Sequence, residues 1–421
     1  MRVAIVGLGI AGLRAAMLLQ RAGVDLSLFE ARDYLGGRLK SEPEGYDSGG
    51  EWIDADHERC LALLHELDLK IWQPPSTPRR FLYQGDWCTE ETLWPDALEH
   101  EIRLEAAARE LCRNLRRPAW DNWEAAALDQ MTLGQFIDQH STTDRGRWYL
   151  RARALSDEGD DPERIGLLGW LAGYQNYLQR QGGEMSAFRI QGGARALVFA
   201  MADTGVDPCL RKVLQRVEQS PTGVRLTFED GSSEEFDQAI LTLPPRGLEK
   251  VIFDPPLTPE KRCAIEACRM SRTIKVCFAF KSRWWREQNW DGAMQCDLAL
   301  QQTWDGSRDD GAILTSYICG SESERWTSLD DPVAFGVQQL EGLFPGVKEQ
   351  FVVGWVHDWN SDPFARGGFS QTAPGYVLQH MRHIGTPEGR VHFAGEHTSP
   401  WLGFIEGALE SAERVANELV R

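Results

Sequence analysis

A glycine-rich turn near the N-terminus carries the clearest chemical signal in the sequence, and it consists of Gly7, Gly9 and Gly12. The turn lies between an apolar stretch at 3–6 that predicts a strand and a helical pattern at 13–22. This spacing provides a tight turn, a close backbone approach to a pyrophosphate, and close packing of helix against strand. Glu30 ends a second predicted strand, where its carboxylate can accept hydrogen bonds from ribose hydroxyls. We therefore predict a βαβ unit that binds a dinucleotide, with the phosphates at the helix N-terminus.

A second glycine pair with a basic residue follows shortly after that acid. Gly36 and Gly37 precede Arg38, so the chain offers another close backbone approach and a guanidinium that can bind the pyrophosphate. A simple nicotinamide site has no such second clamp. A longer cofactor such as FAD is therefore favoured.

The C-terminus predicts another strand-to-helix unit. Residues 390–394 are strand-like, Gly395 and Glu396 form a turn, and apolar residues recur with helical spacing from Ile405 to Leu419. The aromatic loop 401–404 comes directly before this helix. The positive end of the helix should therefore face whatever the loop surrounds.

Length and composition set the remaining limits. The 421 residues suffice for two or three domains. The net charge of −18 disfavours nucleic acid as a partner and favours cations such as protonated amines. The nine cysteines form no CxxC pair and no zinc spacing, so we expect a cytoplasmic protein and no metal site. No apolar run has the length of a membrane helix, and no membrane anchor is expected.

The middle of the chain mixes two patterns. Residues 97–117 and 132–155 have helical patterns rich in charge and alanine, whereas 210–243 alternates apolar and polar residues around turns. Further strands are expected at 273–280 and 352–359. Helical insertions should therefore interrupt a scaffold that contains sheets.

Several parts of the sequence together resemble the flavin-containing amine oxidase family, which includes monoamine and polyamine oxidases. The landmarks span residues 3 to 416 in the order of the family, although 76–189 contains none. They are Gly7 to Gly12, 30–32, 35–38, 47–53, 191–193 with Leu197, 241–245, 252–257, 359–369 and 393–398.

The resemblance implies an α/β fold, with a Rossmann-like FAD-binding domain of the glutathione-reductase type and an inserted mixed α+β substrate domain. The FAD-binding domain is expected at 1–73, 189–262 and 364–421, and the substrate-binding domain at 74–188 and 263–363. It also implies a set of cofactor-binding residues. These are Gly7, Gly9, Gly12, Glu30, Arg32, Gly37, Arg38, Gly50, Glu51, Trp52, Val213, Trp359, Gly395, Glu396, Phe404 and Ile405.

The resemblance also implies the residues nearest the chemistry. Lys275 matches a lysine that holds a water near the flavin N5, although a strand lysine taken alone would be expected to face water. Phe369 and Phe404 match two aromatic rings, often tyrosines, that flank the amine and orient its α-C–H bond. Trp401, in the loop before Phe404, is predicted to belong with them. Taken alone, each phenylalanine would more simply be core packing.

Gly368 stands where mammalian monoamine oxidases carry the cysteine that is attached to FAD, and no cysteine follows Cys319. The resemblance therefore implies that FAD is bound noncovalently. The expected reaction is oxidation of a primary or secondary amine to an imine, with O2 or another electron acceptor regenerating the cofactor. We expect a monomer or homodimer. Neither Glu184 nor His397 receives a role.

Three alternatives stay open. An L-amino acid oxidase of the same fold needs an arginine for the substrate carboxylate, and only Arg59 is available in the stretch where relatives carry one. A desaturase or oxidase acting on carbon could use tryptophans within 284–304 to bind a bulky aromatic substrate. A flavin-bound scaffold without catalysis is the third.

Overall fold

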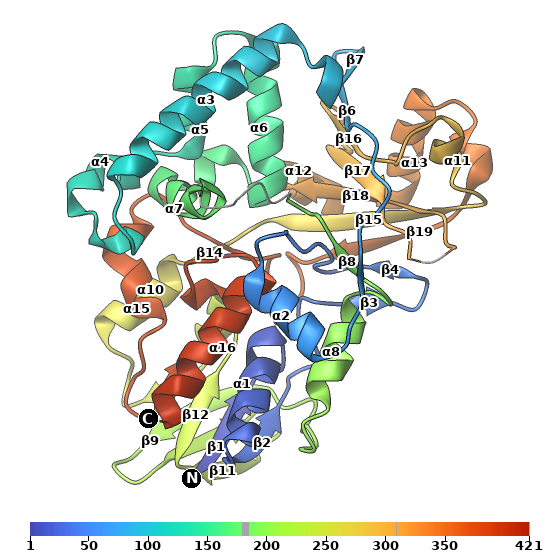
Figure 1. The fold of residues 1–421 in the computed structure, drawn as a ribbon. Coiled ribbons are helices and arrows are strands. Elements are labelled where there is room, and N and C mark those ends of the chain that lie inside the picture. The colour runs from blue at the N-terminus through green and yellow to red at the C-terminus, as the bar shows by residue number, and fades with distance from the viewer. Residues whose placement is uncertain (179–184, 309, 421) are drawn as a thin grey trace.

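The computed structural model describes residues 1–178, 185–308 and 310–420 (Figure 1). Glu184 lies outside these described residues. A parallel sheet with the strand order β2-β1-β12-β21 occupies one end of the molecule, where both termini lie. Its strands are β1 (Arg2–Val6), β2 (Asp25–Phe29), β12 (Gln238–Leu241) and β21 (Val391–Phe393). The N-terminal and C-terminal units that the sequence predicts therefore meet in one sheet.

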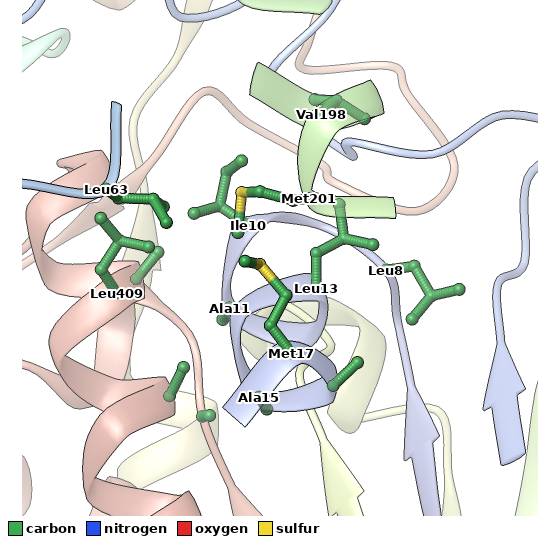
Figure 2. Close-up of a cluster of buried hydrophobic side chains, with 14 of the residues drawn as sticks. Leu8, Ile10, Ala11, Leu13, Ala15, Met17, Leu63, Val198, Met201 and Leu409 are labelled. Carbon is green, nitrogen blue, oxygen red and sulfur yellow. The ribbon is translucent and has the colours of Figure 1, made fainter. Parts of the chain in front are cut away.

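Helices cover one face of this sheet (Figure 1). They are α1 (Ile10–Arg21), α2 (Glu58–Glu66), α8 (Ala194–Ala202) and α16 (Ile405–Val420). Figure 2 shows Leu63, Met201 and Leu409, from three of these helices, gathered around α1. Alanines in α1 allow the close approach, because they add little volume between the two helices that pack together, α1 and α16.

A second sheet, with the order β11-β10-β9-β13, packs its core residues against the other face of the parallel sheet. Its strands are β9 (Leu214–Gln219), β10 (Val224–Phe228), β11 (Ser233–Phe236) and β13 (Ile252–Asp254). The alternating pattern at 210–243 thus gives β9, β10, β11 and β12. The short α9 (Pro245–Leu248) follows β12, and α10 (Pro259–Ala267) follows β13.

The inserted segments build a mixed sheet of seven strands with the order β19-β15-β18-β17-β16-β6-β7. The strands are β6 (Arg80–Tyr83), β7 (Asp86–Thr89), β15 (Thr273–Phe280), β16 (Met294–Cys296), β17 (Gln302–Asp305), β18 (Ile313–Cys319) and β19 (Phe351–Asp358). Because β15 lies between β18 and β19, nearly all of its residues are buried, and the alternation of the sequence does not expose one face to water. Three two-stranded sheets complete the strands: β3 (Ser41–Glu42) with β4 (Tyr46–Asp47), β5 (Ile71–Trp72) with β8 (Arg189–Ile190), and β14 (Arg269–Met270) with β20 (Ser370–Gln371).

Two groups of helices accompany this sheet (Figure 1). The first group is α3 (Pro95–Asn114), α4 (Ala126–Gln130), α5 (Leu133–His140), α6 (Asp144–Glu158) and α7 (Leu167–Leu178). The second group is α11 (Trp284–Glu287), α12 (Gly320–Thr327), α13 (Pro332–Leu343) and α14 (Val347–Gln350), whereas α15 (Arg382–Ile384) lies beside α10. The pattern at 132–155 gives two helices rather than one, because the Thr143 hydroxyl accepts the Gly146 N–H and starts α6 afresh. No helix within the described ranges is long and apolar enough to cross a membrane.

Candidate functional site

A large cavity of ≈ 1720 Å³ lies where the two terminal units meet the inserted segments. Every predicted site residue lines it except Gly12 and Trp401, as far as the structure describes the lining. Residues from both ends of the chain therefore face the same space as Lys275 from β15. A cavity of this size can hold a dinucleotide together with a small substrate.

The glycine turn shapes one end of the cavity. Gly7 has a φ of +92°, which favours glycine, and its N–H donates to the Phe29 carbonyl at 2.8 Å. A Cβ on Gly12 would lie 2.0 Å from the Gly7 carbonyl oxygen, so Gly12 serves helix packing and not the lining. A Cβ on Gly9 would meet no protein atom closer than the Gly36 carbonyl oxygen at 3.8 Å, yet Gly9 faces the cavity. This open backbone fits the close approach of a pyrophosphate.

Glu30 holds its carboxylate at the same end. One carboxylate oxygen accepts the Leu8 N–H at 2.7 Å, and the other accepts the Arg32 N–H at 2.9 Å. These bonds fix a buried acid at the edge of the cavity, where it fits ribose hydroxyls. The Arg32 guanidinium is held by both carboxylate oxygens of Asp362, at 2.8 and 2.6 Å.

Arg38 and Glu396 join the two terminal units. Arg38 Nη1 donates to Glu396 Oε1 at 2.7 Å and to the Gly368 carbonyl at 3.1 Å. Glu396 Oε2 also accepts the Gly403 N–H at 2.8 Å, so it anchors the loop before α16. Burial alone would raise the pKa of Glu396, but the Arg38 charge and these hydrogen bonds hold it below its usual range. Glu396 is thus an ionised clamp that aims the N-terminus of α16 into the cavity.

Lys275 is buried beside an acid. Its Nζ donates to Glu51 Oε2 at 2.9 Å and to the carbonyls of Asp47 at 3.2 Å and Gly49 at 2.7 Å. The Trp304 indole N–H donates to the other Glu51 oxygen at 2.7 Å. The ion pair ties β15 to the loop that contains Gly50, and it places an ammonium on the cavity wall.

The two phenylalanines line the cavity, but Trp401 does not belong to its described lining. A Cβ on Gly159 or on Gly403 would lie 2.8 or 2.9 Å from the Phe369 ring, so both glycines leave room for it. His57 packs edge-on against Phe404 at 5.0 Å between ring centroids, and against Trp401 at 5.8 Å. Trp401 therefore supports the aromatic wall from behind.

The structure adds lining residues that the sequence did not suggest. Tyr317 is the cross-strand partner of both Lys275 and Gln302, so the three side chains lie in one row on the same face of the sheet. Asp157 also lines the cavity, and so does Trp304, which belongs to the 284–304 stretch that the sequence offered for a bulky aromatic substrate. The alternation in β17 and β18 could have indicated the lining face of each strand. Their pairing with β15 could not be read from one sequence.

Most of the side chains that kept alternatives open belong to packing. Arg59 donates to Glu406 at 3.1 Å and to Glu413 at 3.1 Å, both on α16, and is not among the described lining residues. The tryptophans at 284, 285 and 290 are buried in the core behind the seven-stranded sheet. Arg59 and these three tryptophans therefore do not contribute to the described lining, whereas Trp304, from the same 284–304 stretch, does.

His397 is fully enclosed next to Glu396, and neither ring nitrogen has a hydrogen-bond partner among the described residues. Burial lowers its pKa to about 4 from 6.5, although the Glu396 charge favours protonation. Between pH 6.5 and pH 4 the histidine is protonated in the unfolded chain but still neutral in the folded protein. The free energy of unfolding therefore decreases as the pH falls through this range.

We expect His397→Leu to weaken this acid sensitivity. The wild type should lose about 2 kcal/mol more unfolding free energy than the variant between about pH 7 and about pH 5. Urea unfolding of both FAD-loaded proteins at the two pH values measures the difference. An equal loss of unfolding free energy in the wild type and the variant would show that His397 does not titrate in this way.

The comparisons with known proteins agree with this geometry. A family profile described as flavin containing amine oxidoreductase matches residues 10–420. An L-amino acid dehydrogenase of Synechocystis is 25% identical over 99% of this chain and 94% of that protein. A flavin-containing amine oxidase of Oncorhynchus mykiss is 26% identical over 99% of this chain and 85% of that protein.

Solved structures show the same fold. Cyclohexylamine oxidase from Brevibacterium oxydans matches with a TM-score of 0.89 at 25% identity, over 100% of this chain and 99% of that one. A putrescine oxidase matches with a TM-score of 0.90 at 22% identity, over 100% of this chain and 99% of that one. The predicted family and fold class are confirmed. The chain belongs to the flavin-containing amine oxidoreductase family.

Proposed function

We propose that this protein oxidises a primary or secondary amine to an imine with noncovalently bound FAD, and that O2 or another acceptor then removes the electrons. With O2 the second product would be H2O2. The observation that carries the proposal is the shared cavity: the glycine turn, the N-termini of α1 and α16, Lys275 and the two phenylalanines all face one space. Bound FAD supplies the hydride acceptor there.

The residues of the chain divide the remaining work. The N–H groups at the start of α1 bind the pyrophosphate, and Glu30 binds the ribose. The start of α16 places positive partial charge where the cofactor gains negative charge on reduction. Phe369 and Phe404 orient the amine. Lys275 positions a water at the reacting end with the N–H that otherwise makes its longest hydrogen bond, to the Asp47 carbonyl at 3.2 Å. The other predicted lining residues, such as Trp52 and Val213, complete the cofactor walls.

A second candidate is L-amino acid oxidation, and one observation favours it. Arg79 lines the cavity, and no ion pair to its guanidinium occurs among the described residues. Such a group could bind a substrate carboxylate. Comparing an amino acid with its decarboxylated amine separates the two candidates, because only an amino acid oxidase gains from the carboxylate.

Anaerobic mixing with a panel of aliphatic amines, aromatic amines, diamines and amino acids tests the function. We expect at least one amine to bleach the absorbance of the bound flavin. Bleaching by amino acids but not by their decarboxylated amines would support the second candidate. If no compound of the panel bleached the flavin, both candidates would fail, and a noncatalytic scaffold would be favoured.

Noncovalent attachment gives a separate prediction. Gly368 lies on the cavity wall, and none of the nine cysteines is among the lining residues that the structure describes. No thiol is therefore available to bond the cofactor. Acid precipitation should release all yellow FAD into the supernatant, as measured by absorbance. Flavin that stayed with the pellet would contradict this prediction.

We also propose that the FAD-binding domain comprises 1–73, 189–262 and 364–421, and the substrate domain 74–188 and 263–363. The first three segments hold the parallel sheet and the second sheet, and the others hold the seven-stranded sheet. The limit between 262 and 263 falls inside α10, which would then be shared by both domains.

A further inference from the structure

We propose that Asp157 forms a second cation-binding subsite in the cavity, and that the preferred amine carries another positive charge on a short aliphatic chain. This inference rests on the proposed function and narrows its substrate class to diamines. It assigns a specificity role to a residue that the sequence did not single out.

Asp157 occupies the last turn of α6, and its side chain lines the cavity. Asp157 is an exposed residue, and its place in the lining shows that it faces the cavity. No hydrogen bond or ion pair to its carboxylate occurs among the residues that the structure describes. A carboxylate in this position is available to a ligand.

The surroundings of Asp157 are unfavourable for its negative charge. The C-terminal end of a helix carries negative partial charge, which favours cations there. Burial and the Asp54 charge raise the pKa of Asp157, while the Arg153 and Arg79 charges oppose the shift. Arg153 is already engaged, because its Nη1 donates to Glu101 and to the Tyr149 hydroxyl. A cationic ligand would stabilise the ionised carboxylate, as expected of a perturbed group in a binding site.

The end of α6 lies close to the proposed reacting end. A Cβ on Gly159, two residues beyond Asp157, would lie 2.8 Å from Phe369 Cζ. Ser156 Oγ donates to Gln302 Oε1 at 2.6 Å. Gln302 is two strands away from Lys275, which corresponds to about 10 Å. An amine between Phe369 and Phe404 and an ammonium at Asp157 would then be separated by a distance of at most about this size, which a short aliphatic chain can span.

Arg79 provides the competing interpretation. If its guanidinium and not Asp157 selects the substrate, a carboxylate at the far end of the substrate should improve binding. Selection by Asp157 predicts that an added ammonium improves binding, whereas selection by Arg79 predicts that an added carboxylate does. The experiment compares butylamine, diaminobutane and aminobutyrate, which differ in the group at the far end.

Oxidation is first measured by anaerobic stopped-flow reduction of the FAD-loaded enzyme. We expect diaminobutane to have at least about a tenfold lower Kd than butylamine, with a similar limiting rate. Asp157→Asn should remove most of this difference and leave butylamine unchanged. Glu158→Gln is the matched control: burial and the Asp157 charge raise the pKa of Glu158 to about 8, and it is not among the described lining residues. This control should keep the preference.

Binding is then measured without oxidation. A diamine whose amine-bearing carbons carry methyl groups in place of hydrogen has no α-C–H bond to oxidise. Calorimetry with this compound and the corresponding monoamine should reproduce the preference in the wild type and its loss in Asp157→Asn. This arm also shows whether the variant still binds a monoamine, and hence whether its site is intact.

Each outcome decides the inference. A preference for diaminobutane that disappears in Asp157→Asn and persists in Glu158→Gln supports it. Equal affinity for mono- and diamines, a preference for aminobutyrate, or a diamine preference unchanged in Asp157→Asn overturns it while amine oxidation stands. If none of the amines reduced the flavin, the proposed function itself would fail.

Discussion

Lys275→Met should lower the anaerobic rate of flavin reduction by about a hundredfold or more, because it removes the positioned donor on the cavity wall. It should also destabilise the protein by about 2–3 kcal/mol, since the buried Glu51 carboxylate loses its ammonium partner and keeps only the more distant Arg189 guanidinium at 3.6 Å. Stopped-flow absorbance and urea unfolding of the FAD-loaded protein measure the two effects separately.

A double variant distinguishes the role of Lys275 in the reaction from its role in stability. Adding Glu51→Gln to Lys275→Met removes the buried carboxylate charge that has lost its ammonium partner. The introduced amide oxygen can still accept from the Trp304 indole, which donates to Glu51 in the wild type at 2.7 Å. We expect unfolding free energy to recover substantially. The rate of flavin reduction should stay low. If the free energy of unfolding and the rate of flavin reduction both recovered, Lys275 would only support the fold.

The parts of the fold that could be predicted from sequence depend on local spacing. The glycine turn, β1 and α1 follow from contacts among neighbours in the chain, and β15 at Thr273–Phe280 has the expected bounds. The break between α5 and α6 was missed because it depends on the side chain of one threonine, Thr143, accepting a backbone N–H. Local patterns of polarity do not carry that detail.

The candidate site shows the same limit. The resemblance to a family supplied the positions of Lys275, Phe369 and Phe404, and the structure places all three on the wall of one cavity. Their supporting contacts join segments that are hundreds of residues apart, as in the bond from Lys275 to Glu51. Asp157 was missed for the same reason, since its importance comes from where the end of α6 meets the cavity.

Among the glycines, Gly9 and Gly12 should respond in opposite ways to the same substitution. Gly9→Ala should fold with a stability within about 1 kcal/mol of the wild type, because Gly9 has a φ of −73° and room for a Cβ. Its methyl group would occupy the space in which the pyrophosphate approaches. We therefore expect FAD affinity to fall at least about a hundredfold.

Gly12→Ala is the matched comparison. The new Cβ would lie 2.0 Å from the Gly7 carbonyl oxygen and must push α1 away from the turn. This should destabilise the apoprotein by about 3 kcal/mol, because a packed backbone contact cannot relax cheaply. Urea unfolding of the apoproteins and titration with FAD measure both variants. A stable Gly9→Ala protein with wild-type FAD affinity would show that the cofactor does not pass this turn, and the assignment of the cavity would then be wrong.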